Sequence, residues 1–129
     1  MPLDPDAQLV LDMIRAAGRP PFETLTPAEA RVAYANSRKV LQPPPEPVAD
    51  VRDMTAPGPA RDIPVRLYRG AGTTPDEKLP ALVYYHGGGW LLVDLDSHDV
   101  VCRRFANAAR CCVVSHCDCS ACEHIQPEL

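Results

Sequence analysis

Leu82-Val-Tyr-Tyr-His-Gly-Gly-Gly-Trp90 joins a continuous apolar run to three consecutive glycines. The run from Pro80 to Tyr85 predicts a strand covered on both faces, because it lacks the alternation of a half-exposed strand. Glycine has no side chain to pack, and it loses more backbone entropy on folding than other residues. Three in a row therefore favour a specialised loop that needs positive φ angles or a close approach to the main chain.

Such a loop can direct several backbone N–H groups at one point, as an oxyanion hole does for the negative charge that develops in acyl transfer. A flexible turn is the alternative, although three glycines exceed what a turn needs. Acyl transfer also requires a nucleophile, which a G-x-S-x-G turn can supply. The serines of this chain lack glycines two residues away on each side; they are Ser37, Ser97, Ser115 and Ser120. The sequence thus predicts half of an active site.

Two helices are predicted before the sheet. Asp4 caps the first helix, Pro5 occupies its first position, and Gly18 ends it. The capping-box pair of Thr26 and Glu29 begins the second helix, which runs to about Leu41. The first helix carries an apolar face made of Leu9, Val10, Met13, Ile14 and Ala17.

The remaining elements are shorter. Residues 51–54 predict a weak strand, and residues 63–68 predict a strand with alternate residues buried, in which Pro64 favours an edge position or an irregular start. Asp96 or Ser97 can cap a third helix, followed by a strand over residues 111–115. Strand, helix and strand in this order predict parallel pairing with a right-handed crossover. The predicted buried stripe of the third helix is Val101, Cys102, Phe105 and Ala108.

Three stretches in series resemble the hormone-sensitive-lipase-like branch of the α/β-hydrolases, which are carboxylesterases and lipases. They are residues 80–90, the Asp-Leu-Asp-Ser-His-Asp of residues 94–99, and the Cys-Arg-Arg-Phe-Ala of residues 102–106. The resemblance implies an α/β fold: a truncated α/β-hydrolase sheet of about four strands, mostly parallel, preceded by two cap-type helices. The expected division of the chain is 1–47 (cap helices and proline-rich connector), 48–115 (hydrolase domain) and 116–129 (divergent tail).

The resemblance also implies roles for individual residues. The N–H groups of Gly87, Gly88 and Gly89 are expected to face the carbonyl oxygen of a small ester. His86 is expected to hold the shape of the loop rather than act as a general base. Trp90 is expected near the substrate pocket.

The resemblance weakens after Ser115. The family continues with a pattern like Ser-Val-Asp-Tyr-Arg-Leu-Ala-Pro-Glu-His, whereas residues 115–124 read Ser-His-Cys-Asp-Cys-Ser-Ala-Cys-Glu-His. The serine, acid and histidine of the family's catalytic triad belong to the part that does not follow. The expectation is an N-terminal fragment of a serine carboxylesterase, inactive alone, whose tail reflects a disturbed reading frame or a sequence error.

Composition excludes several other classes. The 129 residues carry a net charge of −4, and no basic stripe suggests nucleic-acid binding. No apolar run approaches the roughly 20 residues that span a bilayer, and the acidic start lacks the features of a signal peptide. The expectations are a cytoplasmic protein without a cofactor and without a membrane partner.

Two alternatives concern other parts of the chain. The tail could hold zinc through Cys117, Cys119, Cys122 and His124, although a chance cluster is the favoured interpretation. The chain could also be a non-catalytic interaction module, because a bare apolar sheet edge can pair with another molecule or with a second copy. Cys102, Cys111 and Cys112 are expected to behave as small buried hydrophobic residues.

Overall fold

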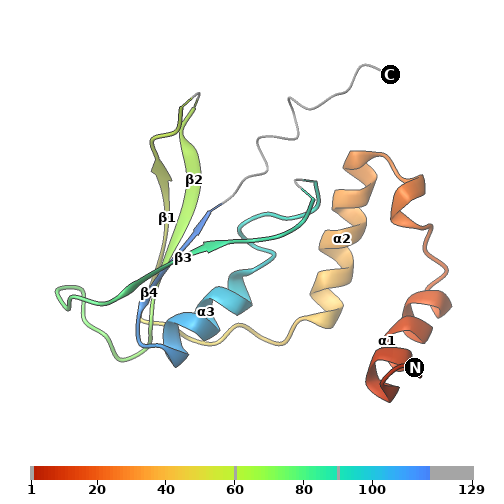
Figure 1. The fold of residues 1–129 in the computed structure, drawn as a ribbon, viewed down its shortest axis with the longest axis horizontal. Helices are drawn as coiled ribbons and strands as arrows, with labels where there is room; N and C mark the ends of the chain where they lie inside the picture. The colour runs from red at the N-terminus through yellow and green to blue at the C-terminus, as the bar shows by residue number, and fades with distance from the viewer. Residues whose placement is uncertain (1, 60, 90, 117–129) are drawn as a thin grey trace.

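The computed structural model describes residues 2–59, 61–89 and 91–116. The elements in chain order are α1 (Pro5–Ala16), the short 3-10 helix η1 (Phe22–Thr24), α2 (Pro27–Leu41), β1 (Asp50–Ala56), β2 (Ile63–Arg69), β3 (Ala81–Tyr85), α3 (Asp99–Ala108) and β4 (Cys112–His116) (Figure 1). No helix within the described ranges is long and apolar enough to cross a membrane.

The strands form one sheet in the order β1-β2-β4-β3. The predicted α/β sheet of about four strands is confirmed, but the prediction that it is mostly parallel is wrong. Among the described strands, only β3 and β4 pair in parallel, while β2 is antiparallel to both β1 and β4. Residues 57–62 are too few for the crossover of roughly a dozen residues that parallel neighbours need. The link over residues 70–80 contains no helix and returns the chain at the same end of the sheet, so β3 and β4 run opposite to β2.

Helix α3 packs against β2 and β4 and closes the core. The core cluster consists of Tyr68, Cys102, Ala106, Cys111 and Val113. Gly70 explains the close approach of helix and sheet, because a Cβ atom there would overlap the backbone carbonyl of Ala106.

The predicted buried stripe of α3 is partly wrong. Val100, Cys102 and Ala106 are buried, whereas Phe105 is 43% exposed. The contact at Gly70 turns the small Ala106 toward the sheet, and this leaves the bulkier Phe105 on the outside. The N-cap also differs, since His98 rather than Asp96 or Ser97 precedes the helix.

Strand β3 is exposed, contrary to the prediction that it is covered on both faces. Val83 and Tyr85 are 55% and 72% exposed, and Leu82 is 38% exposed. The strand lies at one end of the sheet and pairs only with β4 among the described strands. An apolar strand in this position leaves one row of backbone hydrogen-bonding groups without a partner strand.

Pro64 lies near the start of β2, which is an interior strand rather than an edge strand. It pairs with Thr55 of β1, whereas the described pairing of β2 with β4 begins one residue later, at Val65. The missing N–H of proline therefore falls outside the described β2–β4 pairing. The prediction of an irregular start is closer to the structure than that of an edge position.

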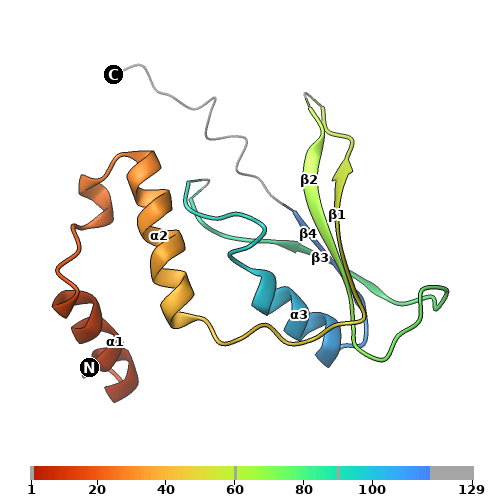
Figure 2. The same ribbon diagram turned by 180° about the vertical axis from the view of Figure 1, so that it is seen from behind.

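The two N-terminal helices begin as predicted. The side chain of Asp4 accepts a hydrogen bond from Asp6 N–H, and Thr26 and Glu29 form a complete capping box. Gly18 follows α1 with a φ of 58°. Helix α1 buries none of its residues, so its predicted apolar face is exposed. Both helices lie to one side of α3 and the sheet (Figure 2).

Candidate functional site

The glycine loop, residues 86–89, follows β3 directly. Gly88 has a φ of 151° and Gly89 a φ of 60°, both in the region that favours glycine. A Cβ atom at Gly88 would overlap the side chain of Val93. The carbonyl oxygen of Gly88 accepts hydrogen bonds from Leu91 N–H (3.1 Å) and Leu92 N–H (3.2 Å), which close the turn. The prediction that the loop needs glycine for a positive φ angle or a close approach is thus confirmed at Gly88, where both apply.

None of the three glycine N–H groups donates a hydrogen bond to another described residue. A Cβ atom at Gly87 or Gly89 would meet nothing within 4 Å. Backbone donors grouped in this way, with open space beside them, can bind an anion or a polarised carbonyl oxygen.

His86 is half-buried, and its ring stacks on the ring of His98. The ring centroids are 5.4 Å apart and the planes differ by 13°. Tyr84 of β3 also neighbours His98, with the two ring centroids 5.7 Å apart. Burial, the neighbouring His86 and the charge of Arg38 lower the pKa of His98 from its ordinary value, so this ring is neutral at pH 7.

The segment after the glycine loop folds on itself through Asp94 and Ser97. Asp94 N–H donates to Ser97 Oγ (2.9 Å), and Ser97 N–H donates to Asp94 Oδ1 (2.8 Å). Ser97 Oγ also donates to the carbonyl oxygen of Asp94 (2.6 Å). Ser97 is 3% exposed. These residues therefore cap a turn before α3 rather than the helix itself.

Helix α2 contacts this segment through polar side chains. Arg31 Nε donates to the carbonyl oxygen of Leu91 (2.9 Å), and Gln42 Nε2 donates to that of Ser97 (2.8 Å). Arg38 lies 3.7 Å from Asp94 Oδ1. A cavity of about 170 Å³ remains between the helix and the segment; it is lined by Arg31, Tyr34, Ala35 and residues 91–94.

The chain is similar to known proteins. A family model described as the alpha/beta hydrolase fold matches residues 82–128, which include the glycine loop. The chain is 43% identical over 103 residues to the carboxylic ester hydrolase LipN of Mycobacterium tuberculosis, covering 78% of this chain and 26% of that protein. It is 38% identical over 117 residues to the carboxylesterase NlhH of the same organism, covering 88% and 34%.

A solved structure of an ester hydrolase from the metagenome of Lake Arreo superposes with a TM-score of 0.81 at 39% identity, over 89% of this chain and 37% of that one. The chain carries part of the α/β-hydrolase fold that these ester hydrolases share. This α/β-hydrolase chain spans about a quarter to a third of the length of the two curated relatives. The family match extends past Ser115 into the tail.

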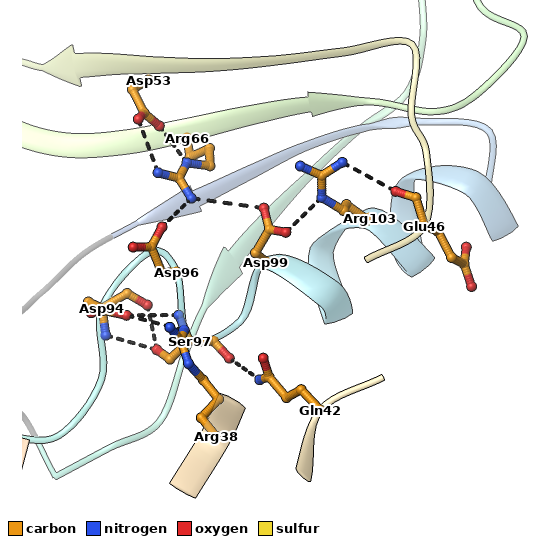
Figure 3. Close-up of polar contacts among 10 residues, drawn as sticks. All are labelled: Arg38, Gln42, Glu46, Asp53, Arg66, Asp94, Asp96, Ser97, Asp99 and Arg103. Carbon is orange, nitrogen blue, oxygen red and sulfur yellow. Dashed lines mark hydrogen bonds and ion pairs between the residues drawn. The ribbon is translucent and has the colours of Figure 1, made fainter. Parts of the chain in front are cut away.

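A cluster of charges centred on Arg66 ties the hydrolase segment 94–99 to the sheet (Figure 3). Arg66 donates twice to Asp53 of β1, through Nε and Nη2. Its Nη1 lies 2.7 Å from Asp96 Oδ1 and 3.9 Å from Asp99 Oδ1. Arg103 also bonds Asp99, at 2.7 Å. The hydrogen bonds from Arg66 hold the pKa of Asp53 below its usual value.

Several predicted site residues lie outside the described ranges of the chain. They are Trp90 and the tail residues Cys117, Cys119, Cys122 and His124. Within those ranges, no group of three or more His, Cys, Asp or Glu residues is placed to hold a metal ion. Cys102 and Cys111 are buried as predicted, and burial raises the pKa of both thiols, while Cys112 is half-buried.

Sequence reasoning missed two features of this α/β-hydrolase site. The first is the contact of His98, whose ring stacks on that of His86, the first residue of the loop. The second is the convergence of two acidic residues of this segment, Asp96 and Asp99, on Arg66. The signal available in the sequence was the charge of Arg66, which has no other charged residue beside it between Ile63 and Tyr68.

Proposed function

We propose that the glycine loop is the oxyanion hole of a carboxylic ester hydrolase. The N–H groups of Gly87 and Gly88, with that of Gly89, bind the carbonyl oxygen of the ester. The observation that carries the proposal is the set of backbone donors without a described acceptor, on a turn that only glycine can form at position 88. In this proposal His86 holds the turn in place, and the role of Trp90 in the substrate pocket stays a prediction from the sequence.

The chemistry follows from the charge that appears during the reaction. When a serine attacks the ester carbonyl, the carbonyl oxygen becomes an oxyanion. Hydrogen-bond donors that are already in position stabilise that charge without rearranging. Loss of one such donor typically lowers kcat by about 10²- to 10³-fold. The substrates are small carboxylic esters. Residues 1–47 form a cap over the loop, and the surface of α2 contacts residues 91–97.

The 129-residue chain alone is expected to be inactive, because its sequence holds no G-x-S-x-G serine. The test is a chimera in which residues 1–116 replace the matched segment of LipN. Hydrolysis of p-nitrophenyl acetate is measured for the chain, the chimera and intact LipN. Activity of the chimera alongside an inactive chain supports the proposal. Ester hydrolysis by the isolated chain above background, abolished by a serine-directed phosphonate, would contradict it.

We also propose self-association through β3. Five apolar or aromatic residues make up this strand, whereas β1 at the opposite edge carries Asp50, Arg52 and Asp53, charges of the kind that protect an edge. Val83→Lys is expected to shift the chain toward monomer in sedimentation velocity. Met54→Lys on β1, where the side chain is 50% exposed, is the matched control and is expected to change nothing. Equal effects of both changes would argue against β3 as the contact.

A further inference from the structure

The stack of His86 on His98 joins the glycine loop to the start of α3. His86 is the first residue of the loop, and His98 is the N-cap residue of the helix. Their ring planes differ by only 13° and their centroids are 5.4 Å apart, so the rings are near-parallel and offset. Tyr84 borders His98 from β3, so His98 contacts both the strand before the loop and the loop itself.

The polar atoms of the stack are what set it apart from an ordinary aromatic contact. Nε2 of His86 and Nδ1 of His98 are both buried, and neither forms a hydrogen bond with a described residue. A protonated imidazole carries an N–H donor at each nitrogen, and a buried donor without a partner is costly. The geometry therefore suits two neutral rings, each with an acceptor nitrogen buried.

The charges around His98 come from three elements. Arg38 approaches from α2, Asp94 from the segment after the loop, and His86 from the loop itself, while Tyr84 of β3 is a neutral phenol. Burial contributes most to lowering the pKa of His98, followed by His86 and Arg38, and Asp94 opposes them. Protonation of His98 would also add a second positive charge near Arg38.

We propose that His98 is a positioning residue for the oxyanion loop: stacking of its neutral imidazole on His86 holds Gly87–Gly89 in place, and proton uptake by His98 releases them. This inference rests on the proposed function for its consequence in catalysis. The positioning itself concerns only the loop conformation.

The direction of the pH dependence follows from the lowered pKa. The pKa of His98 in the folded chain lies below its ordinary value of 6.5, so the folded chain is harder to protonate there than the unfolded chain. Neutral His98 therefore contributes stability that is fully present above pH 6.5. The contribution is lost as the pH falls through the lowered, folded value. The loop is therefore held at neutral pH and released in acid.

The test is NMR of the full chain with isotope-labelled glycine and histidine, between about pH 8 and pH 5. The chain has seven glycines. The signals of Gly87–Gly89 are expected to shift or broaden together with the ring signals of His98. Gly70, which packs on Ala106, and Gly72 are expected to stay constant and report that the fold is intact.

Three variants separate positioning from general stability. His98→Phe keeps a stacked ring without a titrating group, so the loop signals are expected to stay at their neutral-pH positions in acid. His98→Ala removes the ring, and the loop signals are expected to be displaced already at about pH 8. His116→Phe is the matched control, because His116 contacts the ring of Tyr85 instead, and the pH response is expected to persist.

The proposal is overturned if His98→Phe leaves the acid response of the loop glycines unchanged. It is also overturned if His98→Ala leaves their signals in place while Gly70 and Gly72 report a folded chain. Should His98→Ala unfold, the His98→Phe titration decides alone. Failure of the oxyanion proposal has a different signature: the chimera would lack dependence on Gly88 although the loop signals behave as described.

Discussion

Gly88→Ala in the LipN chimera is expected to lower kcat by about 10²- to 10³-fold, the size of effect seen when one oxyanion donor is lost. Gly88 has a φ of 151°, which a residue with a Cβ atom rarely adopts, and the added methyl would overlap Val93. The turn must open to accept it, and this moves the N–H groups on either side. Because those groups act mainly on the charged intermediate, KM is expected to change much less than kcat.

Gly72→Ala is the matched control for that experiment. Gly72 also has a positive φ, 73°, but a Cβ atom there would meet nothing within 4 Å and the residue lies in the 70–80 link. This variant carries the conformational penalty without the clash at the site, so kcat is expected to stay near that of the parent chimera. An equal loss of kcat in both variants would mean that folding, rather than loop geometry, explains the effect.

Arg66→Met is expected to lower the free energy of unfolding by about 1–3 kcal/mol. The Arg66 side chain is only 16% exposed and is the shared partner of Asp53, Asp96 and Asp99. Methionine fills similar space but leaves these carboxylates close together without their common cation. The measurement is urea denaturation of the chain at neutral pH.

The matched control is Arg104→Met, which removes a single ion pair with Glu46 from a side chain that is 64% exposed. Exposed pairs contribute little, so a change within about 0.5 kcal/mol is expected. Acid adds a second readout. Because its pKa is lowered in the folded chain, ionised Asp53 contributes stability above pH 3.8, its usual pKa. This contribution is lost as the pH falls through the lower pKa of the folded chain. That part of the acid dependence is expected to disappear in Arg66→Met and to remain in Arg104→Met.

Features set by neighbouring residues were predictable from the sequence. Thr26 and Glu29 placed the start of α2, and Gly18 placed the end of α1, because a cap satisfies backbone groups within one turn. The glycine loop was found because its cost in backbone entropy has no local compensation. In each case the physical cause lies within a few residues of the effect.

Features set by packing were not predictable in the same way. Periodicity proposed Phe105 for the buried side of α3, but the absence of a side chain at the distant Gly70 decided for Ala106. An apolar run predicted a covered β3, although coverage depends on which elements pack on it. The contact between His86 and His98 needed the path of the chain around the turn, which the spacing of the two residues does not reveal.

The way α2 is attached has a consequence for how this part of the protein can vary among relatives. Arg31 and Gln42 donate to the carbonyl oxygens of Leu91 and Ser97, which every amino acid provides. Substitutions at position 91 therefore leave the acceptor for Arg31 unchanged, and the side chain that lines the cavity there is free to diversify. Covariation is expected to link Arg31 and Gln42 to the backbone path of the segment, through insertions and deletions, rather than to the identities of its residues.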